Sequence, residues 1–228
     1  MALDPDLRER FRRLAAQTPG LDTAAYAQYG KDPLEPIVGL GRRSARVAFF
    51  GRDPGRTEVE RGEPFVGSGG RIVRKALYRH LHGAPMPEAA DAAREAAHAV
   101  GTPFFWINTV PYKPVGNKAW SMAVKRRFHP LVRHLLVDAW RGRHVVTLGR
   151  EAFLWFGIDQ PPPVRAALAA FWQREDRFQA HIEVELRTEA GHARRFTLYP
   201  LPHPSPLNQT WFKRFPALLE ARLRQLSV

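Results

Sequence analysis

The chain has 228 residues, no cysteine, and 35 lysines and arginines against 22 acidic residues, which gives a formal net charge of +13. The lack of cysteine excludes disulfides, thiolate catalysis, and iron–sulfur clusters or zinc sites held by cysteine, so any chemistry must use oxygen and nitrogen groups. The positive charge favours a polyanionic partner, of which nucleic acid is the commonest, although a compositional bias towards arginine is the plainer alternative.

The length suits one large α/β domain as well as it suits two small ones. We expect a single domain over residues 1–228, with residues 1–44 as an N-terminal helix and connection and residues 45–228 as the core. The N-terminus has no apolar signal core, and no stretch approaches the roughly 18 apolar residues of a membrane span. We therefore expect a monomer without membrane contact, in the cytoplasm and associated with the nucleoid.

The N-terminal segment predicts an amphipathic helix that packs on the core. Asp4 and Pro5 can begin this helix, and a Pro-Gly pair at residues 19–20 can end it. Its apolar face at helical spacing consists of Leu7, Phe11 and Leu14. Residues 20–44 carry prolines and glycines without a clear period and predict an ordered surface connection.

Three apolar runs, residues 46–50, 104–108 and 144–148, predict buried strands that alternate with helical patterns. Such alternation is typical of a mostly parallel sheet covered on both faces. A half-exposed strand over residues 178–186 and a returning strand over residues 195–201 follow. In a sheet of this kind the ligand site lies beyond the carboxyl ends of the strands.

Two basic stretches predict helices with solvated faces. In the first, the outward positions include Arg71, Arg74, Lys75 and Arg79. The second, residues 118–143, holds seven basic residues against one acid, and Pro130 is predicted to divide it into two helical pieces. The three prolines at 161–163 predict a loop.

The segment after the first strand reads as a long, rigid loop that carries one acid and one aromatic side chain. Asp53 stands before Pro54 in a turn, where it could orient or activate a water; a turn residue that bonds its own backbone is the commoner alternative. Phe65, between a proline and a valine, could stack on a planar ligand, or it could be an aromatic tucked into the core.

Two further strand ends carry polar residues. Asn108 ends the second strand, where its amide could read the edge of a base or merely satisfy a turn. His203 lies between Pro202 and Pro204, which stiffen the loop and suit a preorganised imidazole; a proline-rich surface turn is the alternative.

Known phosphate-binding and metal-binding patterns are missing. The glycines at 67–70 lack the Gly-Lys-Ser/Thr ending of a P-loop and the spacing of a dinucleotide fold. The histidine pairs do not have the spacing of helical metal ligands. We therefore expect neither a cofactor nor a metal.

Taken together, the motifs resemble the uracil-DNA glycosylase superfamily, over about residues 45–212. They are Gly-Arg-Asp-Pro-Gly at 51–55, Gly-Glu-Pro-Phe-Val-Gly at 62–67, the strand end at Asn108 with the Lys-Pro and Asn-Lys pairs that follow, and His-Pro-Ser-Pro-Leu-Asn at 203–208.

The spacing of the first two motifs is most similar to the family 4 and family 5 enzymes of this superfamily. Those enzymes carry four cysteines for an iron–sulfur cluster, which this chain lacks. Family 4 enzymes typically have Glu at the position of Arg52 and Ala at the position of Asp53, whereas an Asp at the latter position is similar to family 1.

The resemblance implies an α/β fold, a three-layer αβα sandwich around a mostly parallel four-stranded sheet. It implies a DNA glycosylase of base excision repair that flips out and removes uracil or a related deaminated base from single- or double-stranded DNA. In this reading Asp53 and His203 are catalytic, and the base is bound by Arg52, Phe65 and Asn108.

The resemblance also implies supporting and DNA-binding residues. Glu58 would support the loop, and Leu207 would enter the duplex where the base has left. The residues expected to contact DNA are Gly67, Lys118, Ser205, Leu207 and Asn208. The basic stretches 71–79 and 118–127 would add salt-sensitive affinity for the backbone.

Two alternatives remain open from the sequence. One is a catalytically inactive glycosylase-like module that binds damaged or single-stranded DNA, and the other is a hydrolase of free nucleosides. The sequence also leaves open whether the base is uracil, hypoxanthine, xanthine or a modified uracil.

Overall fold

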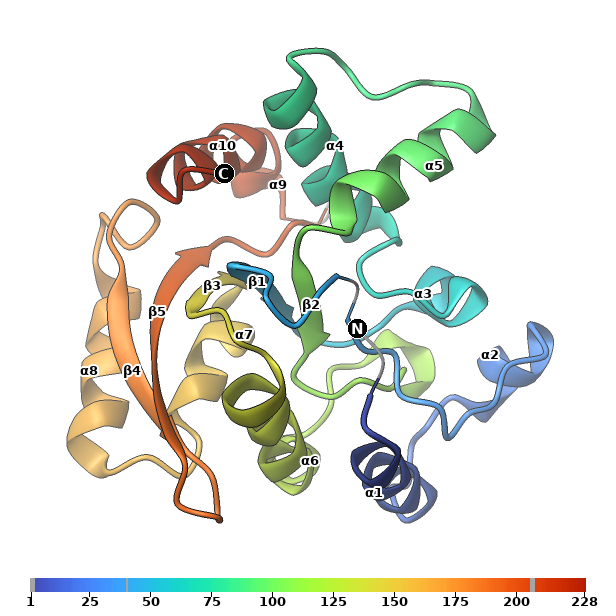
Figure 1. Cartoon of the computed structure of the whole chain (residues 1–228), viewed down its shortest axis with the longest axis vertical. Helices are drawn as coiled ribbons and strands as arrows, with labels where there is room; N and C mark the ends of the chain where they lie inside the picture. Colours follow the sequence, from blue (N-terminus) through green and yellow to red (C-terminus); the bar gives the residue numbers. More distant parts are fainter. Residues whose placement is uncertain (1–2, 40, 206–207) are drawn as a thin grey trace.

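The computed structural model describes residues 3–39, 41–205 and 208–228, and it contains one five-stranded sheet between two layers of helices (Figure 1). The strand order is β2-β1-β3-β5-β4. The strands are β1 (Val47–Gly51), β2 (Phe105–Asn108), β3 (His144–Leu148), β4 (Ile182–Arg187) and β5 (Ala193–Leu201).

This architecture confirms the predicted α/β fold class with a mostly parallel sheet. The four strands β2, β1, β3 and β5 run parallel to one another. A fifth strand, β4, pairs antiparallel with β5 at the edge, so the sheet is one strand wider than predicted. The β4–β5 hairpin therefore belongs to the sheet with both of its strands.

Ten α-helices of the described residues surround the sheet. They are α1 (Pro5–Ala16), α2 (Thr23–Gln28), α3 (Arg56–Arg61), α4 (Ser68–His82), α5 (Ala90–Gly101), α6 (Met122–His134), α7 (Arg150–Leu154), α8 (Pro162–Gln173), α9 (Gln209–Phe212) and α10 (Phe215–Gln225). None of the described helices combines the length and the apolar character that crossing a lipid bilayer requires.

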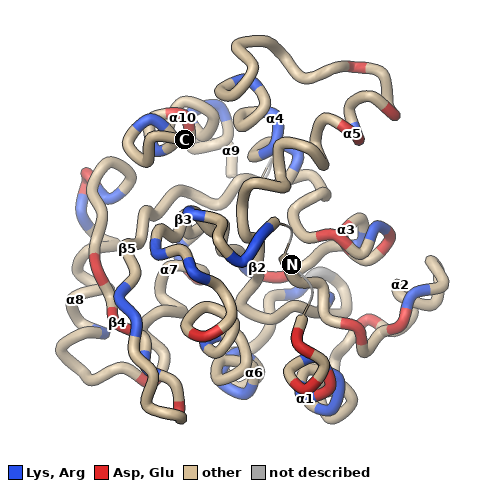
Figure 2. The backbone as a smooth tube through the Cα atoms, viewed as in Figure 1, with Lys and Arg blue, Asp and Glu red and all other residues tan. Residues whose placement is uncertain are grey.

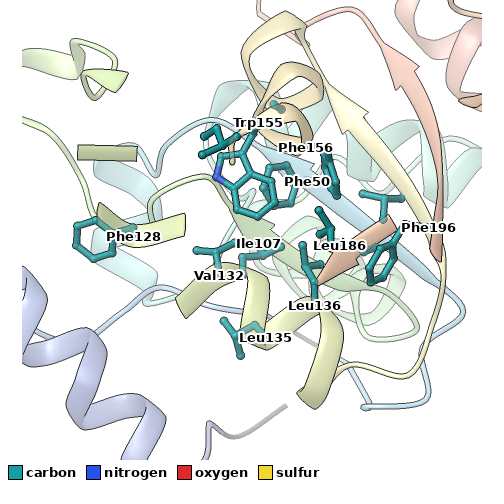
Figure 3. Packing of buried hydrophobic residues seen from close by; sticks show 14 of the residues in the cluster. Phe50, Ile107, Phe128, Val132, Leu135, Leu136, Trp155, Phe156, Leu186 and Phe196 are labelled. Atoms are coloured by element: carbon teal, nitrogen blue, oxygen red, sulfur yellow. The ribbon is translucent and has the colours of Figure 1, made fainter. Parts of the chain in front are cut away.

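Alternate residues of the central strand β1 enter two separate cores, because successive side chains of a strand point to opposite faces. Phe50 belongs to the larger core, where its ring lies 4.8 Å from Trp155 and 5.1 Å from Phe156 (Figure 3). Helices α1, α6, α7 and α8 contribute to this core. Phe49 belongs to the other core and stacks on Trp106 at 4.4 Å; helices α4, α5 and α10 cover that face.

The N-terminal helix forms as the sequence predicts. The Asp4 carboxylate accepts hydrogen bonds from the backbone N–H groups of Asp6 and Leu7, and Pro5 occupies the first turn. Phe11 is fully buried and its ring stacks 6.4 Å from that of Phe128 on α6. Helix α1 is thereby packed on the same face of the sheet as α6.

Two helices occupy segments that were predicted to be loops. Helix α3 lies inside the loop after β1, and α8 begins at Pro162, within the proline run. The prediction of a loop at 161–163 was wrong because proline is tolerated in the first turn of a helix, where its missing N–H would have no partner. The connection at 20–44 likewise contains the short helix α2.

Helix α6 continues through Pro130, so the predicted division there was also wrong. A proline inside a helix costs about 3 kcal/mol or more. The buried residues on either side of it, Phe128, Leu131 and Val132, pack this helix onto the larger core and offset that cost. Beyond His134 the helix widens into a π-helix over Leu135–Ala139.

Candidate active site

A cavity of about 390 Å³ opens at the carboxyl edge of the parallel strands. Its walls come from the segments that follow β1, β2, β3 and β5. The residues singled out from the sequence that line it are Arg52, Asp53, Glu58, Phe65, Gly67, Asn108, His203 and Ser205. Segments far apart in the sequence thus meet where the parallel sheet predicts a site.

The register of β1 and β2 sets the floor of the cavity. Gly51 and Asn108, the last residues of the two strands, are direct partners in the ladder. A Cβ atom at Gly51 would collide with the ring of Phe65 and lie 2.8 Å from the amide oxygen of Asn108. Glycine at this position is therefore what allows the ring and the amide to converge.

The ring of Phe65 is held in place from behind. It packs at a tilt against Trp106, with 5.2 Å between the ring centroids. The backbone of Phe65 has a positive φ of 57°, and its carbonyl accepts a hydrogen bond of 2.8 Å from the Arg74 guanidinium. The same guanidinium donates to the carbonyl of Pro64 at 2.9 Å. Arg74 thus fixes the backbone that carries the aromatic ring.

The prediction that Arg74 points outward was wrong. Its side chain is completely buried, forms an ion pair of 2.8 Å with Glu63 and lies 4.9 Å from the centre of the Trp106 ring. Burial lowers the pKa of Arg74, although the charge of Glu63 opposes this. Helical spacing could not reveal this, because the partners of Arg74 lie in the preceding loop, on α5 and on β2 rather than on its own helix.

Glu58 links the two ends of the loop after β1. Its carboxylate is buried on α3 and accepts hydrogen bonds from the backbone N–H groups of Gly55 at 3.0 Å, Val66 at 3.0 Å and Gly67 at 2.6 Å. A Cβ atom at either glycine would lie 2.8 Å from a carboxylate oxygen. The two glycines therefore allow the backbone to close around the acid.

Asp53 is buried but only partly hydrogen-bonded. Its side chain is 4% exposed, and its Oδ2 atom lies 3.1 Å from Nε of Arg52. Within the described part of the chain, its Oδ1 atom has no hydrogen-bond partner. Burial raises the pKa of Asp53 to about 6, while the positive charges of Arg52 and Lys125 oppose the rise. The group is thus mostly ionised at neutral pH, but close to protonation.

The sequence analysis missed two charged residues behind Arg52. Lys125 on α6 is buried and forms an ion pair with Glu151. Glu151 in turn lies 4.0 Å from Nη1 of Arg52. It stands in the first turn of α7, directly after β3, so attention to the end of that strand would have found it. Lys125 carried no comparable signal.

His203 follows β5 and lies at the mouth of the cavity. Its backbone carbonyl accepts hydrogen bonds from the N–H of Ser205 at 2.8 Å and from the amide of Asn208 at 3.4 Å. A Cβ atom at Gly149, which has a φ of 95°, would lie 3.0 Å from Cβ of His203. Partial burial by the cavity walls and, secondarily, the charge of Arg52 lower the pKa of His203. The lowered pKa favours the neutral imidazole.

The remaining predicted residues lie elsewhere. Lys118 is exposed in the segment between β2 and α6 and does not line the cavity. Asn208 contacts His203 but is not part of the lining either. Leu207 lies outside the described residues. No group of three or more metal-ligating side chains occurs in the described ranges.

The cavity can hold a flat ligand with a polar edge. Phe65 offers an aromatic face, and the amide of Asn108 makes no hydrogen bond to another described residue, so its donor and acceptor can serve a ligand. A carboxylate and a neutral imidazole face the same space. These two groups can orient a water and stabilise a developing negative charge, respectively.

Comparison with known proteins gives two matches. The family model described as the uracil DNA glycosylase superfamily matches residues 38–227. A type-4 uracil-DNA glycosylase of Archaeoglobus fulgidus is 42% identical over 41 residues, which cover 18% of this chain and 21% of that relative. The chain therefore matches about a fifth of the length of this curated relative.

Proposed function

Because the chain belongs to the uracil-DNA glycosylase superfamily, we propose that it is a monofunctional DNA glycosylase of base excision repair. It would flip a uracil or a related deaminated base out of DNA and hydrolyse its N-glycosidic bond. One observation carries the proposal: the buried Asp53, with one oxygen unpartnered among the described residues, shares a single cavity with Phe65, Asn108 and His203.

The base would bind between an aromatic face and an amide. Phe65 stacks on the flipped base, and Asn108 pairs with its N3 and O4 edge through one donor and one acceptor. Backbone groups at Arg52 and Asp53 complete the binding. Support comes from the ladder that pairs Gly51 with Asn108, because it fixes the amide relative to the ring.

The reaction would proceed by attack of water on C1′ of the deoxyribose. The C1′–N bond breaks, its electron pair leaves with the base, and the water loses a proton as the new C1′–O bond forms. Asp53 holds the water at Oδ1, accepts its proton and offsets the positive charge of the oxocarbenium-like sugar. His203, as the neutral imidazole, donates a hydrogen bond to the developing anion at O2 of the base.

The DNA would approach from the side of the strand ends. Gly67, Ser205 and Asn208 would contact phosphates next to the flipped nucleotide, and the exposed Lys118 would add charge at greater distance. We keep Leu207 as the proposed wedge in the duplex. The chain would act as one domain and as a monomer, without a cofactor.

The test is excision from DNA that contains uracil, followed by alkali, which cleaves at abasic sites. We expect Asp53→Asn and His203→Ala each to reduce excision by at least about tenfold while DNA binding is largely kept. Asp91→Asn, an exposed acid on α5, is the matched control. Full activity of both purified site variants would contradict the proposed roles, and a panel of other deaminated bases would identify the substrate.

A second candidate is a DNA-binding module that does not cut the bond. The ion pair between Arg52 and Asp53 favours it, because it occupies one carboxylate oxygen that a water could otherwise use. The same experiment separates the two candidates. An inactive module leaves uracil-containing DNA without alkali-labile sites, yet binds it more tightly than undamaged DNA.

A further inference from the structure

A second concave surface lies between α4 and α5, with a volume of about 630 Å³. We call it the α4–α5 groove. Arg71, Lys75 and Arg79 follow one another at intervals of four residues, so they lie along one face of α4. Arg61 at the end of α3 and Arg94 on α5 complete the basic lining. Blue segments recur along α4 in Figure 2.

The positive charge in this groove is largely uncompensated. Four of its exposed basic residues, Arg61, Arg71, Lys75 and Arg79, form no ion pair with any other described residue, and Arg94 lies 3.8 Å from Asp91. Among the lining residues, Glu88 is the sole acid. A concave surface with like charges of this density favours a polyanion.

The opposite wall of the groove is mostly apolar, apart from Glu88 and Arg94. It consists of Pro85, Met86 and Pro87 in the connection between the two helices, together with alanines of α5. A basic wall facing an apolar one suits a nucleic-acid strand. Its phosphates can contact the basic wall, and its sugars and bases can contact the apolar wall. An acidic peptide would leave the apolar wall unused.

The groove borders the candidate active site. Val66 lines the groove and the next residue, Gly67, lines the cavity. Residues 68–70, in the first turn of α4, form part of the cavity wall, and the next residue, Arg71, lines the groove. The buried Arg74, which also lines the groove, donates to the carbonyl of Phe65. One DNA strand can therefore pass from the cavity into the groove.

We propose that the α4–α5 groove binds the sugar–phosphate backbone of the substrate strand on one side of the target nucleotide. The three charges on α4 are spaced roughly 6 Å apart along the helix axis, which makes a linear track for successive phosphates. The inference rests on the proposed function for the identity of the strand. Its consequence is that affinity grows with the length of DNA on one side of the base.

The test compares the triple variant R71Q/K75Q/R79Q with a matched control, R42Q/R141Q/R143Q. The control removes three exposed arginines near the amino ends of β1 and β3, away from the cavity. Binding is measured at several salt concentrations with undamaged single-stranded DNA of about 20 nucleotides, for which the loss of three phosphate contacts lowers the slope of log K against log salt by about 2. The control should leave the slope almost unchanged.

A second measurement locates the contact relative to the base. Excision is followed on a trinucleotide with uracil in the middle and on strands extended only on the 5′ side or only on the 3′ side. The triple variant should impair excision on one extended strand, by at least about tenfold in kcat/KM at low salt, and much less on the trinucleotide.

Several outcomes would overturn the inference. They are an equal loss of slope in the two triple variants, an unchanged slope in both, or equal impairment on both extended strands. Failure of the proposed function is distinguishable, because the wild-type protein would then leave every uracil-containing strand intact. The salt slopes on undamaged DNA would still report whether the groove binds the backbone.

Discussion

Two buried carboxylates in the same loop, Glu58 and Asp53, have opposite surroundings. Glu58 accepts three backbone hydrogen bonds and holds the loop together. Asp53 pairs with Arg52, is also influenced by the charges of Lys125 and Glu151, and has one oxygen without a hydrogen-bond partner among the described residues. A buried polar group without its hydrogen bonds destabilises the folded state. The comparison indicates that Glu58 serves the fold, whereas one oxygen of Asp53 is left available to a ligand, as the proposed function requires.

The largest effect is expected from Glu58→Gln, which tests the structural half of the comparison. A glutamine amide has a single acceptor oxygen, so at least one backbone N–H, that of Gly55 in the better orientation, would lose its acceptor and face an NH₂ group instead. We expect the free energy of unfolding to fall by about 3 kcal/mol, measured by urea denaturation. Glu60→Gln, an exposed acid on the same helix, is the control. Equal stability of the two variants would contradict the structural role of Glu58.

Asp53→Asn should have the opposite effect on stability. The folded-state pKa of about 6 lies above the value of 3.8 for a free side chain, so ionisation weakens the folded state. The destabilisation is absent below pH 3.8 and grows as pH rises through about 6. At pH 8 the variant should be more stable by up to about 3 kcal/mol, with little difference at pH 3.5. A variant less stable than the wild type at pH 8 would refute this assignment.

The pH dependence of excision should reveal the same pKa. If the carboxylate is the active form, the single-turnover rate should fall about tenfold between pH 7 and pH 5, since protonation with a pKa near 6 removes that form. An ordinary aspartate would stay ionised over this range. DNA binding is measured in parallel at each pH, and a rate that stays constant down to pH 5 would exclude Asp53 as the titrating group.

The smallest effect is expected from Glu151→Gln, which alters the surroundings of Asp53 without touching it. The negative charge of Glu151 raises the pKa of Asp53, whereas the positive charge of Lys125, the ion-pair partner of Glu151, lowers it. Removing that charge should shift the midpoint of the pH–rate profile to lower pH, by less than about one unit. Glu175→Gln, an exposed acid, is the control, and a shift to higher pH would contradict the electrostatic role.

The sequence predicted the residues at the strand ends better than it predicted the buried residues that hold them in place. Asp53, Asn108 and His203 were candidates because they lie at or just after strand ends, which a parallel sheet brings together. Phe65 was a candidate as the aromatic side chain of the loop after the first strand, and the family resemblance implied the role of each residue. Arg74 was misplaced because, apart from Glu63, its hydrogen-bond partners are backbone carbonyl groups of the preceding loop and of α5. Backbone partners leave no trace in residue type or periodicity.

The fold shows the same limit. Parallel strands and the N-terminal helix follow from apolar patterns and caps, and these were predicted. The alternating pattern over residues 178–186 indicated the half-exposed strand that becomes β4, but the number of four strands implied by the resemblance did not count it in the sheet. Helices α3 and α8 were missed because glycine and proline, read as loop formers, precede and begin them.

The backbone of Phe65 has a consequence for the stability of this protein. Bulky residues rarely adopt a positive φ, and such conformations cost of order 1–3 kcal/mol. Glycine or asparagine would relax the chain at this position, but would remove the ring from the cavity. Stability alone would therefore favour glycine or asparagine over phenylalanine at this position. The strained backbone at Phe65 is therefore a local cost to folding that accompanies the placement of an aromatic ring in the cavity wall.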